Sequence, residues 1–159
     1  MRVREYDMAA GEFPYGERIA LGEIFARADL SDYGKMKAAW RELYGWSARL
    51  LPPLARARAF TRLVEGLNGW VEREQQMLSY TPTPDEAAAG YEAYCKRMGP
   101  SGTIYALAKD YGCDPDTILR WPYAKVFGIL YHDLEQLKFG RAYDKVLTGK
   151  AKRYGNGAH

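Results

Sequence analysis

The sequence predicts an all-α protein: a single-domain helical bundle with a helix-turn-helix-like unit and a long C-terminal helix. Apolar residues recur at three- and four-residue spacing along much of the 159-residue chain, and several of these segments follow residues typical of helix starts. The strict alternation of strands is almost absent. With 47% apolar and 14% aromatic residues, the chain can bury one core. We expect one helical domain over residues 1–147, including an N-terminal arm (1–16), and a flexible basic tail (148–159).

The first half of the chain should contain two short helices and one long helix. These helices are predicted at residues 17–28, 35–44 and 54–79. Ser31 is the expected N-cap of the second helix, and a Pro-Pro pair precedes the third. The apolar stripe of the third helix is interrupted only by Glu74. Trp70 lies in the middle of that stripe and should pack against Phe127 or Leu130 of the final helix.

The second half carries the clearest helix start. Thr83 and Glu86 form a capping-box pattern, in which both side chains satisfy free backbone N–H groups of the first turn. The helix that they begin should end near Met98, before a segment rich in glycine and proline at residues 99–102. A final helix is predicted over residues 123–147. Its apolar stripe consists of Val126, Phe127, Leu130, Leu134 and Leu137.

Residues 103–121 fit the helix-turn-helix pattern position by position. Ala108 is the small residue where the two helices would touch, and Gly112 falls at the turn. Apolar side chains occupy the positions that such a motif buries: Leu107, Tyr111, Cys113, Ile118 and Trp121.

The predicted second helix of this unit, residues 114–121, has the wrong charge for DNA. Asp114 and Asp116 outnumber Arg120, whereas a helix that approaches phosphates normally supplies cations. A DNA-binding regulator would use Thr117 and Arg120, exposed side by side. In the alternative, structural interpretation, the first aspartate caps the helix and its apolar residues belong to the core.

No enzyme motif or metal-ligand pattern is evident, so we expect a non-enzyme without cofactor or metal. Cys95 and Cys113 are too few for a disulfide framework, and His132 lacks the further strong ligands that a metal site needs. No apolar segment approaches the length of a membrane span, and the N-terminus lacks the apolar core of a signal peptide. We therefore expect a cytoplasmic protein with no membrane partner.

Two basic clusters are candidates for binding an acidic partner. The first contains Arg49, Arg56, Arg58 and Arg62, with no acid between residues 47 and 62. The second spans residues 138–153, where Asp144 is the only acid. Such clusters suit nucleic acid or an acidic protein surface, although a solvated helix face explains them nearly as well.

The chain has more aromatic residues than a helical domain of this size needs for its core, with 13 tyrosines and 4 tryptophans. Aromatic side chains are favoured anchors at protein interfaces. Tyr6, Phe13 and Tyr15 of the polar N-terminal arm are the ones expected at the surface. The arm as a whole should lie in a groove of its own domain or of a neighbouring subunit, because it is too apolar to remain freely solvated.

Several segments resemble small helical proteins encoded by phages and prophages of gut Bacteroidetes. These segments are EYDMAAGEFPYGERIALGEIF, KAAWRELYGW, GLNGWVEREQQMLSYTPTPDE and CDPDTILRWPYAKVFGILYHDLEQLKFGRAY. The resemblance implies a non-enzymatic tail assembly chaperone or another virion morphogenesis factor in the cytoplasm of the bacterial host. Its partner would be a phage structural protein or a second copy of the chain. The alternative function is a helix-turn-helix DNA-binding regulator, which the charges disfavour.

Overall fold

The structure is a computed structural model that describes residues 8, 10–45 and 52–155. Every element assigned in these residues is a helix, so the all-α prediction is confirmed. The helices are α1 (Tyr15–Ala26), α2 (Asp32–Tyr44), α3 (Pro53–Met77), α4 (Pro84–Ala88), α5 (Tyr91–Asp110), α6 (Pro115–Leu119) and α7 (Tyr123–Gly155).

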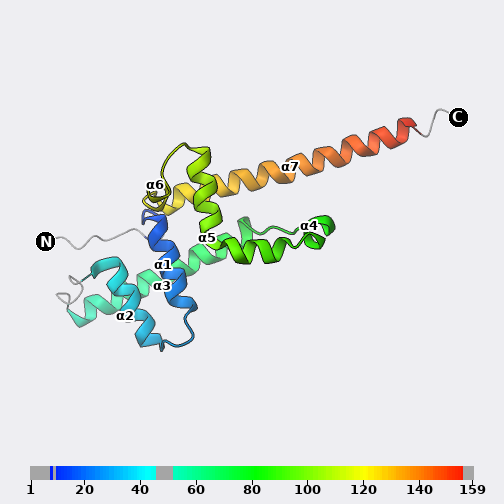
Figure 1. Ribbon diagram of the computed structural model, residues 1–159. Helices are drawn as coiled ribbons and strands as arrows, with labels where there is room; N and C mark the ends of the chain where they lie inside the picture. Colours follow the sequence, from blue (N-terminus) through cyan, green and yellow to red (C-terminus); the bar gives the residue numbers. More distant parts are fainter. Residues whose placement is uncertain (1–7, 9, 46–51, 156–159) are drawn as a thin grey trace.

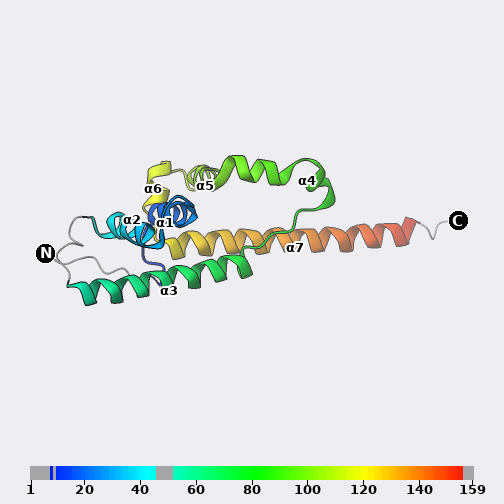
Figure 2. The same cartoon turned by 90° about the horizontal axis from the view of Figure 1, so that it is seen from below.

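Two long helices, α3 and α7, run in the same direction along one side of the molecule (Figures 1 and 2). Helices α1, α5 and α6 lie on the other side, over the N-terminal half of α7, and α2 lies beyond the start of α7, beside the N-terminal part of α3 (Figure 2). The C-terminal end of α7 extends past the other helices in both views. The core therefore lies where the start of α7 meets α1 and the second half of α3.

The N-terminal segment, described at Met8 and at residues 10–15, forms part of this core. The Phe13 carbonyl accepts the Tyr123 N–H at 2.8 Å, and the Gly11 carbonyl accepts the Ala124 N–H at 3.0 Å. Gly11 has φ +71°, and a Cβ atom there would lie 2.5 Å from the Trp70 ring. Only glycine fits this position, because it tolerates the backbone conformation and leaves room for the indole.

The expectation that the aromatic residues of the arm are exposed is therefore wrong for Phe13 and Tyr15. Phe13 is 0% exposed and Tyr15 is 8% exposed. The segment cannot form a helix, but backbone hydrogen bonds to residues 121–124 satisfy its polar groups and allow its side chains into the core. Tyr6 lies outside the described residues.

Trp70 packs as predicted against the final helix. Its ring contacts Phe127 edge-on, with centroids 5.2 Å apart, and Tyr123 at 5.0 Å. The indole N–H donates to the Met8 carbonyl at 2.7 Å, so the one polar atom of this buried side chain is satisfied. Trp70 thus joins α3 to both the N-terminal segment and α7.

Glu74, one turn further along α3, binds two other helices. Nη2 of Arg18 in α1 donates to both oxygens of the Glu74 carboxylate, at 2.8 Å each. The Tyr123 hydroxyl of α7 donates to the same carboxylate. Burial, and then the hydrogen bond to Glu74, raise the pKa of the Tyr123 hydroxyl. The phenol therefore remains a protonated donor, and the carboxylate fixes the positions of α1 and α7 on α3.

A second polar contact holds α4 against the middle of α7. The capping box is present as predicted: the Glu86 N–H donates to Thr83 Oγ1, and the Thr83 N–H donates to the Glu86 carboxylate. The same carboxylate accepts the Tyr80 hydroxyl and forms an ion pair with Arg141 of α7. Glu86 therefore both caps α4 and attaches it to α7.

The break predicted after Met98 is present: Gly99 has φ +50° and ψ −148°, and a further helical segment then runs to Asp110. Two helix boundaries differ from those predicted. The helix that begins at Pro84 ends at Ala88, and α5 starts only after Gly90, which has φ +84°. Helix α7 runs to Gly155 and does not end near Leu147. Lysine, alanine and arginine in this last segment favour a helix, and the isolated Gly149 does not stop it.

Replacing Trp70 with alanine should lower the free energy of unfolding by about 3–5 kcal/mol, through lost burial and the cavity left behind. Chemical denaturation measures this loss. The adjacent Val71, which is 38% exposed against 5% for Trp70, provides the control, since Val71→Ala removes a smaller and more exposed side chain and should cost less. A loss below about 1 kcal/mol for Trp70→Ala would contradict the assignment of this residue to the core.

The contact at Glu86 should make stability depend on pH. The Thr83 N–H and then the Tyr80 hydroxyl lower the pKa of this carboxyl from 4.5 to about 2. Because the folded pKa is the lower one, the stabilisation is complete above about pH 5 and is lost as the pH falls towards 2. The difference in melting temperature between the wild type and Glu86→Gln should therefore shrink over that range. A difference that stays constant from pH 6 to pH 2 would show that ionisation of Glu86 does not stabilise the fold.

Candidate functional site

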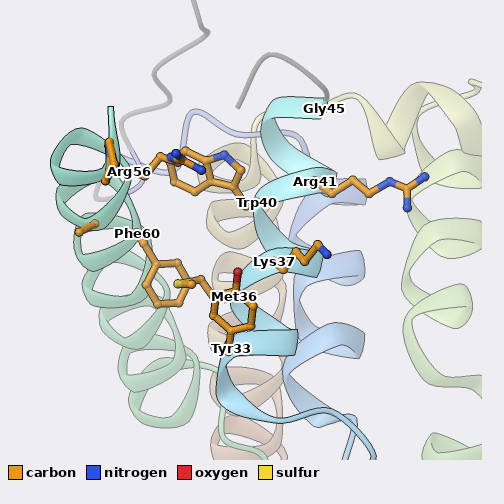
Figure 3. Close-up of a pocket in the computed structure, with 10 residues that line it drawn as sticks. Tyr33, Met36, Lys37, Trp40, Arg41, Gly45, Arg56 and Phe60 are labelled. Carbon is orange, nitrogen blue, oxygen red and sulfur yellow. The ribbon is translucent and has the colours of Figure 1, made fainter. Parts of the chain in front are cut away.

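A groove with a volume of about 730 Å³ lies between α2 and the first turns of α3 (Figure 3). It is lined by Tyr33, Met36, Lys37, Trp40, Arg41, Gly45, Pro53, Arg56, Ala57 and Phe60, and is called the α2–α3 groove below. Its volume falls in the range of about 300–1,000 Å³ that is usual for ligand sites.

One wall of the groove is a face of α2. Ser31 caps this helix as predicted, with its Oγ accepting the Gly34 N–H at 3.2 Å. Ala39, Trp40 and Leu43 are its buried residues, with Trp40 9% exposed, and α2 packs on α1. Met36 and Trp40 are turned towards α3, and Figure 3 shows them in the space between the two helices. The helix therefore has a core face and a groove face.

The other wall is the N-terminal part of α3. The fully or nearly fully buried residues of this helix begin only at Leu63, and Leu54 is 66% exposed. The first two turns thus extend beyond the core and present Arg56 and Phe60 to the groove. Figure 3 shows the Phe60 ring pointing towards Met36. The interior of the groove is therefore aromatic and apolar.

The rim of the groove is positively charged. Lys37, Arg41 and Arg56 are the charged residues that line it, and none of the lining residues is acidic. In Figure 3 the charged ends of Lys37 and Arg41 point away from α3, which places them on the outer side of α2. The arginines in this part of α3 lie near the positive end of the helix dipole. The first turn contains no acidic residue that would offset this charge. This arrangement favours an anionic partner with an apolar part.

The structure places the predicted arginine cluster only partly at this site. Arg56 lines the groove, whereas Arg58 and Arg62 are exposed on α3 and do not line it. Arg49 lies outside the described residues. Of the aromatic candidates, Phe13 and Tyr15 are in the core and are not available to a partner.

Of the residues that line the groove, Arg56 alone was a site candidate, and the aromatic and apolar residues Tyr33, Met36, Trp40 and Phe60 were missed. Met36 and Trp40 recur at four-residue spacing along α2. Three- and four-residue spacing does not distinguish a face that packs in the core from a face that lines an open groove. The four residues form one surface only because α2 and α3 are separated by the groove.

The segment expected to form a helix-turn-helix-like unit contains the end of α5 and the short helix α6. Ala108 is buried where α5 meets its neighbours, Gly112 has φ +59°, and Ile118 is 0% exposed. Helix α6 packs on α5 and α1. Thr117 is half-buried, while Arg120 is exposed and donates from Nε to a backbone carbonyl.

No protein-family model, curated protein or solved structure matches this chain. In the part of the chain that the structure describes, no helix has an apolar stretch long enough to cross a lipid bilayer. Within the same residues, no group of three or more histidine, cysteine, aspartate or glutamate side chains is placed to hold a metal ion.

Proposed function

We propose that this protein is a non-enzymatic protein-interaction factor that binds an acidic, amphipathic helix of its partner in the α2–α3 groove. The observation that carries the proposal is the composition of the groove. Its interior is formed by aromatic and apolar side chains, and its charged lining residues are all cations.

The shape of the groove suits a helix. The lining residues of α2, from Tyr33 to Arg41, recur at three- and four-residue spacing, so the groove follows this helix for more than two turns. Amphipathic helices commonly bind by placing their apolar face between two helices of the partner. Trp40 and Phe60 are aromatic anchors of the kind that contribute most to such interfaces, and Met36 can adapt to different side chains.

The charges select the partner. A bound helix with acidic residues beside its apolar face would bring them near Arg56 of α3, whereas Lys37 and Arg41 lie on the outer side of α2 and add to the positive potential around the groove. The neighbouring Arg58 and Arg62 extend the positive potential along α3 and would attract such a partner before contact. Binding should therefore weaken as the salt concentration rises.

The resemblance to phage and prophage proteins supports a specific role for this binding. In that role the protein is a tail assembly chaperone or another virion morphogenesis factor, and the bound helix belongs to a phage structural protein. Covering an apolar helix until assembly would protect that protein from aggregation, which is consistent with an aromatic groove bordered by cations.

A synthetic helical peptide with leucines on one face and glutamates beside them provides the probe. It should bind and shift the indole N–H resonance of Trp40 in a ¹H–¹⁵N spectrum. Ala57→Trp should abolish binding by filling the groove, and Arg56→Glu should weaken it by about tenfold, equivalent to about 1.4 kcal/mol.

Arg62→Glu is the matched control: it reverses the same charge on the same helix outside the groove lining, so it changes only the surrounding potential and should weaken binding less than Arg56→Glu. A peptide with glutamine in place of glutamate should bind more weakly. Equal binding of the two peptides, or equal effects of Arg56→Glu and Arg62→Glu, would contradict the proposal. Binding that survives Ala57→Trp would place the peptide elsewhere.

A further inference from the structure

The C-terminal part of α7 carries a second apolar surface, on the side of the helix opposite the core stripe. Phe139 is 73% exposed, Tyr143 is 55% exposed and Val146 is 54% exposed. They follow one another at four- and three-residue spacing, with the 46% exposed Leu147 beside them, so they form one stripe on the helix. This surface, residues Phe139, Tyr143, Val146 and Leu147, is called the outer stripe.

No described element covers the outer stripe. Arg141 makes the contact between α7 and α4. This residue lies on the core-facing side of α7, away from the outer stripe. Beyond that contact, α7 extends past the other helices (Figures 1 and 2). The rings of Phe139 and Tyr143 stack on each other with centroids 6.3 Å apart, so part of the stripe is already ordered by its own contacts.

The charges at the two ends of the outer stripe are complementary to each other. Glu135 lies four residues before Phe139, and Lys150 lies four residues after Val146, both on the same helix face. Phe139 and Val146 are each four residues from the charge at their own end of the stripe. Two antiparallel copies would therefore pair Glu135 with Lys150 of the second copy, and Phe139 with Val146 of the second copy, at both ends.

We propose that the outer stripe binds a second copy of this chain, with the two α7 helices antiparallel. A parallel pair would place each glutamate and each lysine opposite its own copy, so like charges would repel at both ends. Glu135 also forms an exposed ion pair with Lys138, which contributes little and can be exchanged. The α2–α3 groove has no part in this contact, so the dimer does not depend on the function proposed above.

The dimer should be weak and should depend on concentration, because one pair of short helical segments buries less surface than a permanent interface. Sedimentation velocity of the wild-type chain should show a monomer that converts to a dimer as the concentration rises. Phe139→Ser should weaken the dimer at least about tenfold, since it removes the most exposed aromatic anchor.

Charge reversal tests the orientation. Lys150→Glu alone should weaken the dimer several-fold, because it places two acids opposite each other at both ends of the antiparallel pair. The double variant Glu135→Lys with Lys150→Glu should restore it. Lys145→Glu is the control: it makes the same charge change on a different face of α7. Circular dichroism confirms that each variant keeps its helix.

A wild-type chain that remains monomeric over the whole concentration range would overturn the proposal. So would a dimer that Phe139→Ser leaves intact, because its contact would then lie elsewhere. A dimer insensitive to Lys150→Glu, or one that the double variant does not restore, would overturn the antiparallel arrangement. Ala57→Trp should leave the dimer unchanged, which separates this contact from the groove.

Discussion

The Glu74 carboxylate is the contact on which the arrangement of the domain depends. It lies on α3 and accepts hydrogen bonds from Arg18 of α1 and Tyr123 of α7, so one side chain determines how three helices meet. An arginine and a tyrosine can enter the edge of an apolar core only where their polar atoms find partners. Removing this carboxylate would leave both donors without their acceptor, beside the aromatic cluster around Trp70.

The position of α1 in turn determines the α2–α3 groove. Helix α2 packs on α1 through Ala39 and Leu43, so its other face is held at a distance from α3. The first turns of α3 extend beyond the core and supply the opposite wall, with Arg56 and Phe60. The groove is thus a consequence of core packing.

Local chemistry was readable from the sequence, whereas contacts between distant segments were not. The caps at Ser31 and Thr83 depend on a few adjacent residues. The contact of Trp70 with the final helix could be predicted because two long apolar stripes have few other places to pack. Glu74 looked like an interruption of a stripe because its partners are far away in the chain. The burial of Phe13 depends on backbone pairing with residues 121–124, which no residue pattern encodes. The groove walls were assigned to helices correctly, but their separation depends on tertiary packing.

The N-terminal segment has a consequence for how the chain folds during synthesis. Gly11 and Phe13 pair with residues at the start of α7, so these contacts join the first part of the chain to its last helix. The segment leaves the ribosome long before α7 exists, and the part of the Trp70 ring that Tyr123 and Phe127 cover stays open until that helix is made. Such long-range closure is slow compared with helix formation and leaves apolar surface exposed while synthesis continues. The nascent chain therefore completes its core only when α7 emerges, although α1, α2 and α3 can each form earlier.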